Sequence, residues 1–534
     1  MTRKVVSYFF ILSLVIFCLQ ACVRYYYFRG NYQTVNELIH NTKKLNPKPY
    51  LKAHLKSGDV CILWDQWKID TLTNTLSGNG KLYDFNRAQI DSGALTISID
   101  KVTIFETNTK LLNPEENRIM ALSILAGVDV IIGLLCLTNP KACFGSCPTF
   151  YLNDKDNFHF SDAEGFSNAI APSLEYSDID ALGRKPNITD TFSITMKNEA
   201  LETHCVRNVS IMVYPLEGEE RVFQSPANDF FLCNKFYGLS GASGFEGDIT
   251  PLLKDQDKIE RYSASDEKNL TNKEEIFLNF DQLDSKQELG LILHFRQTLM
   301  TTYFIYNAIS YMGDEVSDIF AKIENDNETK NKLDQGLKKE LGNIELYTMD
   351  EETKKWVHQS GFYETGPVAI NKQMIPLNVK SGIKKLRIKI VLNKGLWRVD
   401  YAALAGIKKK VSLMEISPVS IMNKGVLDHQ AHEEIINPDK FLISMPGSAY
   451  KINFKLPAVA NDFEFFLYSK GYYLEWMRQD WIKDKDLLKL KQMIYEPRKY
   501  LKDQAIPYKE YERNMEQQFW NSKIDTKTFS YYEK

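Results

Sequence analysis

A long apolar run in the first third of the chain constrains the fold most strongly, because all of its residues must be kept from water. The run extends from Ile119 to Thr138, and Asp129 is its single charged residue. About 20 such residues suffice to span a bilayer, but a charge at the centre of a spanning helix costs roughly 2.5–3.5 kcal/mol. A helix that is apolar all round also suits the centre of a folded core. The sequence therefore predicts a buried apolar helix over residues 111–140, with membrane insertion and partner binding as the alternatives.

Two cysteines bracket the turn that follows this run. After Pro140, Cys143 and Cys147 enclose Phe-Gly-Ser, and Pro148 follows directly. The small residues between the two thiols permit a tight loop, so a Cys143–Cys147 disulfide is predicted, in keeping with an oxidising envelope compartment. Two other interpretations carry less weight, because a metal site lacks further ligands nearby and a redox-active pair is usually spaced C-x-x-C.

The N-terminus has the pattern of a bacterial lipoprotein signal. The basic pair Arg3-Lys4 precedes an apolar run that ends at Leu19, and Leu-Gln-Ala-Cys22 fits the sequence that is cleaved just before an acylated cysteine. We therefore expect residues 1–21 to be a signal peptide and Cys22 to carry acyl chains, palmitate among them, as a stable anchor. An ordinary signal peptide and an uncleaved anchor are the alternatives. No aspartate follows Cys22, which favours the outer membrane and its periplasmic side.

Charge and motif content exclude several classes of function. The 534 residues carry a formal net charge of -3 without a basic arm or stripe, so no nucleic-acid partner is expected. No P-loop, dinucleotide-binding fingerprint or zinc-protease motif occurs, and we expect no cofactor. Tyrosine and phenylalanine are abundant, at 28 and 30 residues, which favours sheets over helical bundles.

Short strands separated by turn residues predict a multidomain, β-rich α+β fold. Helical patterns are expected at 298–323 and at 472–502. The units expected after the signal peptide are, in order, a stalk with a small β-barrel-like domain (22–110), the apolar helix (111–140), a β domain that opens with the cysteine hairpin (141–250), a strand with a helical connector (251–341), a β-sandwich-like domain (342–420), and a C-terminal β unit with an amphipathic helix (421–534).

The cysteine turn also carries a resemblance. Residues 143–151, Cys-Phe-Gly-Ser-Cys-Pro-Thr-Phe-Tyr, resemble the C-x-G-x-C-P-x-aromatic hairpin of small bacterial envelope proteins. Segments 198–204, 395–400 and 471–477 are similar to parts of a multidomain family of bacterial envelope lipoproteins. The resemblance extends over residues 51–483, implies a shared fold, and brings no known activity with it.

Two pairs of residues are candidates for catalysis or metal binding. Glu202 and His204 lie two residues apart, so on a strand they share one face, where they could act as acid and base or hold a buried hydrogen-bond network. His429 and His432 form a weak metal candidate, since they do not complete H-E-x-x-H and lie in a predicted solvated loop. We expect the structural role for both pairs.

Aromatic and acidic residues suggest two binding surfaces. Glu364, Trp397 and Asp400 resemble the polar edge of carbohydrate-binding sandwiches, although a turn and a core tryptophan are the favoured explanation. Tyr473 and Trp476 belong to an aromatic cluster that either anchors an interface or fills a core.

The function predicted is a lipid-anchored envelope protein with a structural or interaction role and without enzymatic activity. The alternatives are a glycan- or peptide-binding lipoprotein that uses the 342–407 sandwich, and a hydrolase whose site the sequence does not reveal. The partners expected are the membrane, through the lipid, and other envelope proteins.

The lipid anchor can be tested directly. We expect mass spectrometry of the native protein to show an N-terminal peptide that begins at Cys22 and carries acyl chains, because the signal is cleaved immediately before the modified cysteine. An unmodified N-terminus would contradict both the anchor and the location inferred from it.

Overall fold

The structure is a computed structural model of the chain. Several predictions fall outside the residues that it describes, namely the signal peptide with Cys22, the apolar run, Cys143, Glu364 and Trp476. The described residues are 25–31, 51–55, 60–70, 72–83, 89–112, 147–152, 160–171, 174–186, 190–200, 202–283, 286–313, 319, 336–363, 366–444, 447–458, 462–475 and 484–521.

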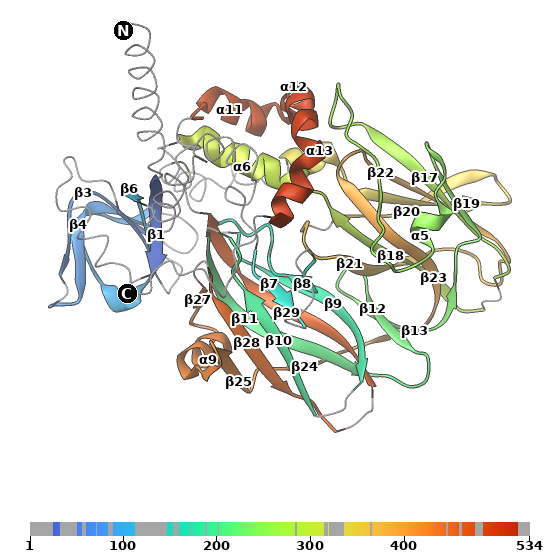
Figure 1. The fold of residues 1–534 in the computed structure, drawn as a ribbon, viewed down its shortest axis with the longest axis horizontal. Coiled ribbons are helices and arrows are strands. Elements are labelled where there is room, and N and C mark those ends of the chain that lie inside the picture. Colours follow the sequence, from blue (N-terminus) through green and yellow to red (C-terminus); the bar gives the residue numbers. More distant parts are fainter. Residues whose placement is uncertain are drawn as a thin grey trace, which may run out of the picture.

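Six antiparallel strands form one sheet at the start of the described chain, the N-terminal sheet, drawn in blue in Figure 1. Its buried side chains include Leu51, Leu63, Trp67 and Phe105. The order across the sheet is β1-β6-β2-β3-β4-β5. The strands are β1 (Tyr25–Asn31), β2 (Leu51–Leu55), β3 (Val60–Asp70), β4 (Thr75–Tyr83), β5 (Gln89–Ser98) and β6 (Val102–Leu112).

Two further sheets pack face to face around one hydrophobic core and form the first sandwich (Figure 1). One sheet has the order β26-β25-β28-β10-β7-β8; the other has the order β24-β11-β29-β9, with β27 beside β11. The strands are β7 (Thr149–Tyr151), β8 (Ala163–Glu164), β9 (Tyr176–Pro186), β10 (Thr191–Lys197), β11 (Glu202–Pro215), β24 (Met414–Ile416), β25 (Ser420–Asn423), β26 (Val426–Leu427), β27 (Leu442–Ser444), β28 (Ala449–Lys455) and β29 (Asp462–Glu475).

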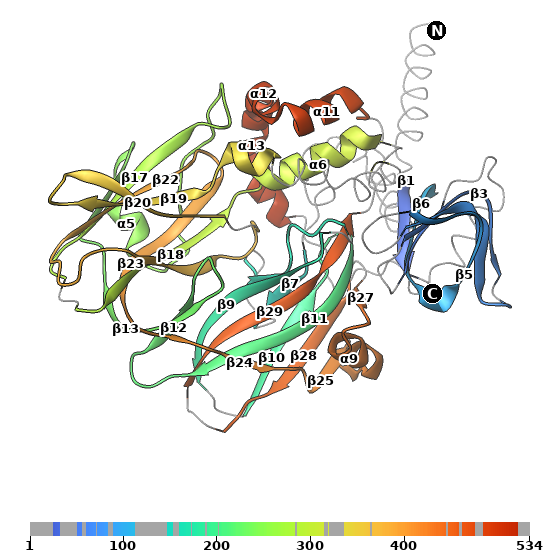
Figure 2. The same cartoon turned by 180° about the vertical axis from the view of Figure 1, so that it is seen from behind.

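The chain between β11 and β24 forms the second sandwich, which is therefore inserted within the first (Figure 2). One sheet contains β12 (Arg221–Gln224), β13 (Phe230–Tyr237), β16 (Arg261–Tyr262), β18 (Glu288–Gln297), β21 (Asn371–Leu377) and β23 (Trp397–Val411). The other contains β14 (Gly241–Gly244), β15 (Gly247–Asp248), β17 (Lys273–Phe280), β19 (Ile344–Asp350), β20 (Lys355–Phe362) and β22 (Leu386–Asn393).

Five strands of the second sandwich close on themselves, and we call them the strand ring. The pairings run β13-β12-β21-β18-β23 and return from β23 to β13, with β12 joined to β21 through Gln224 and Gln373. Side chains on the two faces of each strand therefore have different surroundings. On β18, Leu291 and Leu293 face the other sheet of the sandwich, whereas Ile292 packs inside the ring.

Helices from two distant segments cover the second sandwich. They are α6 (Met300–Met312), α11 (Leu487–Tyr495), α12 (Pro497–Asp503) and α13 (Ala505–Asn521), and they lie together in both views (Figures 1 and 2). Phe304 of α6 stacks on Tyr508 of α13 with ring centroids 6.3 Å apart. Arg296, at the end of β18, donates to Glu516 of α13 over 3.2 Å, so a buried charge pair also fastens the last helix to the sheet.

The strand-rich, multi-sheet fold is confirmed, but several boundaries differ from those predicted. The strands expected to form a separate sandwich over 342–420 divide among three sheets. β22 and β23 need neighbours on both edges, which the earlier strands β17 and β18 provide, and β24 joins the first sandwich. The helix predicted from 472 is wrong in its first part, because Tyr472–Glu475 complete β29; α11, the first helix described after this strand, begins at Leu487. Of the helices in the described part of the chain, none is both long and apolar enough to cross a membrane.

Candidate binding site

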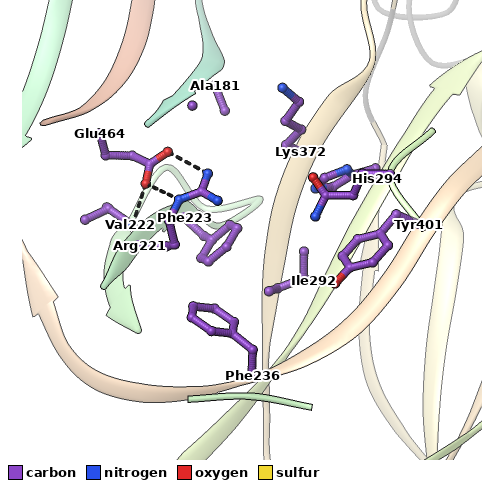
Figure 3. Close-up of a pocket in the computed structure, with 12 residues that line it drawn as sticks. Ala181, Arg221, Val222, Phe223, Phe236, Ile292, His294, Lys372, Tyr401 and Glu464 are labelled. Carbon is purple, nitrogen blue, oxygen red and sulfur yellow. Dashed lines mark hydrogen bonds and ion pairs between the residues drawn. The ribbon is translucent and has the colours of Figure 1, made fainter. Parts of the chain in front are cut away.

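An open pocket lies where the strand ring meets the edge of the first sandwich, and we call it the ring pocket (Figure 3). Its volume is about 150 Å³. Strands of the ring supply most of its wall. β9 and β29 of the first sandwich supply a second part, and Gln256, from the segment between α5 (Thr250–Leu253) and β16, completes it. The lining residues are Ala181, Gly183, Arg221, Val222, Phe223, Phe236, Gln256, Ile292, His294, Lys372, Tyr401 and Glu464.

One wall of the pocket is a row of three polar side chains on neighbouring strands. Lys372 of β21 lies directly opposite His294 of β18, and His294 lies opposite Tyr401 of β23. Directly opposed residues of antiparallel strands have Cβ atoms about 4.5–5.5 Å apart, so the three side chains leave the sheet together. The rings of His294 and Tyr401 are 5.0 Å apart between centroids.

The facing wall holds an ion pair between the two sandwiches. Arg221 donates from Nε and Nη2 to the two carboxylate oxygens of Glu464, over 2.7 and 2.9 Å, and the backbone N–H of Val222 donates to Glu464 over 3.1 Å. Burial opposes the charge of Arg221, but the bonds to Glu464 outweigh it and raise the pKa of the guanidinium. Both oxygens of Glu464 are thus engaged, and the pair contributes no net charge to the pocket.

A glycine beside this pair keeps the wall open. Gly183 has a φ of 86°, a backbone conformation that residues with a Cβ rarely adopt. A Cβ at this position would lie 3.9 Å from Nη2 of Arg221 and 4.0 Å from Oε1 of Glu464. A larger side chain would therefore strain β9 and press on the ion pair.

Apolar side chains form the inner part of the pocket. The rings of Phe223 and Phe236 meet edge to face with centroids 6.2 Å apart, and Ile292 lies across from them (Figure 3). Beneath them, Cys233 and Met374 belong to the hydrophobic core of the ring. The pocket therefore has a polar side and an apolar side, which is the usual composition of a small-molecule site.

Burial and like charges lower the pKa of two groups of the polar wall, His294 and Lys372. Burial, together with the nearby Lys372 and Arg221 charges, lowers the pKa of His294 to about 3, so its imidazole is neutral at physiological pH. Burial is also the largest cause that lowers the pKa of Lys372, and Lys185 and Arg221 add to it, while Asp162 and Glu464 act in the opposite direction.

The sequence alone does not reveal this pocket. Its polar residues come from β12, β18, β21, β23 and β29, and only the sheet register brings them together. A signal was present in β18, where His294 interrupts an otherwise apolar stretch. Such residues point to a buried polar wall, although their partners cannot be read from a single strand.

Three of the predicted site residues, Glu202, His204 and Tyr473, do come together, but in the interior of the first sandwich. The Glu202 carboxylate and His204 Nε2 are 2.8 Å apart, and neither side chain is exposed. On the neighbouring strand, Tyr473 is the register partner of His204, and Glu475 is that of Glu202. Tyr306 of α6 donates to Glu475 over 2.9 Å. These contacts fit the predicted structural role, a hydrogen-bond network closed to solvent.

Cys147 lies in the same region as a free thiol, rather than as half of the predicted disulfide. Its Sγ donates to Glu164 over 3.3 Å, and burial and the Glu164 charge raise its pKa well above the usual value. The other Glu164 oxygen accepts the backbone N–H groups of Val368 and Ala369. The thiol is thus a neutral hydrogen-bond donor at a contact between the two sandwiches. Cys61, Cys205 and Cys233 are likewise free and buried.

Two of the residues considered as a glycan-binding edge, Trp397 and Asp400, lie in the interior. Trp397 is 1% exposed and packs edge to face on Phe295 and Tyr363. Asp400, on the same strand, is 2% exposed. Alternation along β23 accounts for both positions, since each face of this central strand is covered.

The two histidines considered as metal ligands lie on a helix instead of in a loop. The helix is α9 (His429–Ile436). Asp428 precedes it, and its side chain accepts the backbone N–H of Ala431 and so caps the helix. Nε2 of His432 is 3.0 Å from the carbonyl oxygen of Pro418. Within the described ranges, no group of three or more metal-ligating side chains occurs.

No protein-family model matches the chain, and a search of the curated proteins finds no match. The function is therefore inferred from the pocket and from the patterns in the sequence.

Asp400 provides a test of stability against pH. Burial raises the pKa of its carboxyl to about 6, and Oδ1 has no hydrogen-bond partner in the described part of the chain. A raised carboxyl pKa costs stability as the pH rises from the unfolded value of about 4 through 6, because the folded state resists ionisation. We expect Asp400→Asn to raise the free energy of unfolding by about 1–2 kcal/mol at pH 8, and by much less at pH 4. Urea denaturation at both pH values measures the difference.

The exposed Asp439 supplies the matched control, since Asp439→Asn removes a carboxylate that is already solvated. An equal gain from Asp400→Asn at both pH values would show that burial of its charge is not the cause.

Proposed function

We propose that this protein is a lipid-anchored component of the cell envelope that binds a small molecule in the ring pocket and carries out no reaction on it. The observation that supports binding is the pocket itself, an open volume with one polar and one apolar wall formed by two sandwiches. The interaction role expected from the sequence is thereby assigned to the ring pocket.

The positions of the reactive groups favour binding over hydrolysis. Cys147, Glu202 and His204 include the side chains typical of nucleophilic and acid–base catalysis. All three lie buried in the first sandwich, and Cys147 is held as a thiol. In the pocket, His294 has a pKa too low for a general base near neutral pH.

The proposed location in the cell envelope rests on the sequence. We propose acylation at Cys22, an outer-membrane location facing the periplasm, and membership of the envelope lipoprotein family that the cysteine hairpin resembles. The same proposal includes an apolar helix that contains the run from Ile119 to Thr138 and begins after the end of β6 at Leu112, and a barrel-like curvature of the N-terminal sheet. An anchored binding protein of this kind would hold its ligand near the membrane or present it to envelope partners.

Occupation of the ring pocket should be measurable by thermal stability. We expect a subset of fragments from a small-molecule library to raise the melting temperature of the full chain, since a ligand that binds only the folded state stabilises it by mass action. Ala181→Phe places a ring in the pocket from β9 and should abolish those shifts. Ser177→Phe, at an exposed position on the same strand, should leave them unchanged. Shifts that persist in Ala181→Phe would place the binding elsewhere.

A second candidate is glycan binding, and a specific surface favours it. On the outer face of the second sandwich, Phe277, Lys389, Tyr347 and His358 lie opposite one another across β17, β22, β19 and β20. The ring of Trp356 lies 5.8 Å from that of Phe277 on the same face. We call this row the aromatic face, and an accessible aromatic ring within it could stack on the apolar face of a sugar ring. It replaces the buried Trp397 as the part of the 342–407 region that supports this alternative.

Retention in affinity gels that contain soluble polysaccharides tests the second candidate. If the aromatic face binds glycans, Trp356→Ala should weaken retention by roughly 30-fold, because loss of an aromatic hot spot costs roughly 2 kcal/mol or more. Trp356→Phe keeps a ring and should retain most of the binding. Unretarded migration of the unmodified protein in every gel would reject the candidate.

A further inference from the structure

We infer that the ligand of the ring pocket is a small organic monoanion, a carboxylate joined to an apolar group of about one ring, with the carboxylate bound by Lys372. This inference rests on the proposed binding function and adds the chemical class of the ligand.

The charges around the pocket select an anion. Arg221 and Glu464 neutralise each other through two hydrogen bonds, and His294 is neutral. Lys372 is then the one uncompensated charge among the lining residues. A single positive charge in a partly dry site matches one negative charge, so a monoanion fits better than a phosphate dianion or a cation.

Lys372 has no hydrogen bond or ion pair with another residue of the described ranges. The nearby carboxylate of Asp162 interacts with it only at longer range, lines no part of the pocket, and accepts the backbone N–H of Leu152 over 2.7 Å. A half-buried ammonium without a partner loses hydration and gains nothing in return. The carboxylate of a bound ligand would compensate for the lost hydration with a charge-assisted hydrogen bond.

His294 adds direction to the same site. Its neutral imidazole carries one N–H donor, and it stands directly opposite Lys372 in the sheet register. A carboxylate has two oxygens, and the row therefore offers an ammonium to one and an imidazole N–H to the other. Tyr401, next in the row, extends this polar wall.

The apolar side fixes the size of the remaining part of the ligand. Phe223, Phe236 and Ile292 face the space beside the polar row (Figure 3). The pocket volume of about 150 Å³ equals that of an engineered protein cavity that holds benzene. One aromatic ring or a short branched chain fills such a space, whereas a sugar chain or a nucleotide exceeds it.

Three probes of equal size separate the charge of the ligand from its shape. Benzoate, benzyl alcohol and benzylamine share one ring and differ in charge. We expect calorimetry with the full chain in detergent to show benzoate binding about 10-fold or more tightly than benzyl alcohol, and benzylamine binding most weakly. Lys372→Met should remove the preference for benzoate without weakening benzyl alcohol, whereas Lys372→Arg should keep it. Lys410→Met, on β23 outside the pocket, provides the control for loss of a lysine.

The outcomes distinguish this inference from the function on which it rests. Equal binding of benzoate and benzyl alcohol, both lost in Ala181→Phe, would overturn the anionic class while the pocket remains a binding site. Absence of binding by all three probes, together with no hit in the fragment screen, would overturn the binding function itself. A preference for benzoate that survives in a folded Lys372→Met protein would place the anion site elsewhere.

Discussion

The pairing of β11 with β29 is the constraint on which the rest of the structure depends. The two strands are paired from Glu202 with Glu475 to Pro215 with Phe463, so they run side by side along nearly their whole length. The entire second sandwich lies between them in the chain. Closing so long a loop costs conformational entropy, but that cost grows only slowly with length, and a compact insert holds its two ends close together. The buried faces of β11 and β29, with Val209, Ile211, Phe465 and Leu467 in one core, provide the offsetting gain.

The ring pocket is a product of this arrangement. The chain passes from β11 of the first sandwich directly to β12, the first strand of the second. Arg221 at the start of β12 forms its ion pair with Glu464 near the start of β29. The ion pair therefore joins the inserted unit to the strand that completes the outer one. Its geometry holds one wall of the pocket in place, while the ring register aligns Lys372, His294 and Tyr401 on the other. A ligand between these walls contacts both sandwiches, so its binding free energy opposes any motion that separates them.

Much of the local structure was predictable, because strand alternation and turn residues act over a few positions. The strand-rich fold followed from patterns such as β10, where Ile194 and Met196 are buried and their neighbours are not. The shared strand face of Glu202 and His204 followed from their two-residue spacing, and their side chains meet at 2.8 Å. The nested topology was not predictable, since nothing in β22 or β23 indicates that they pair with β17 and β18, which precede residue 342. The aromatic residues from Tyr472 onward were assigned to a helix because their pairing partner, β11, is far away in the sequence. The pocket was missed for the same reason, because each of its walls combines residues from several strands.

The insertion also orders events during synthesis. A ribosome releases β11 long before β29, so while the inserted sandwich is synthesised β11 exposes an edge that only the last part of the chain can cover. Unpaired edges are templates for pairing with other chains. The inserted sandwich contains the partners of its own strands, so its sheets can pair during that delay, while α11, α12 and α13 complete its core only at the end of synthesis.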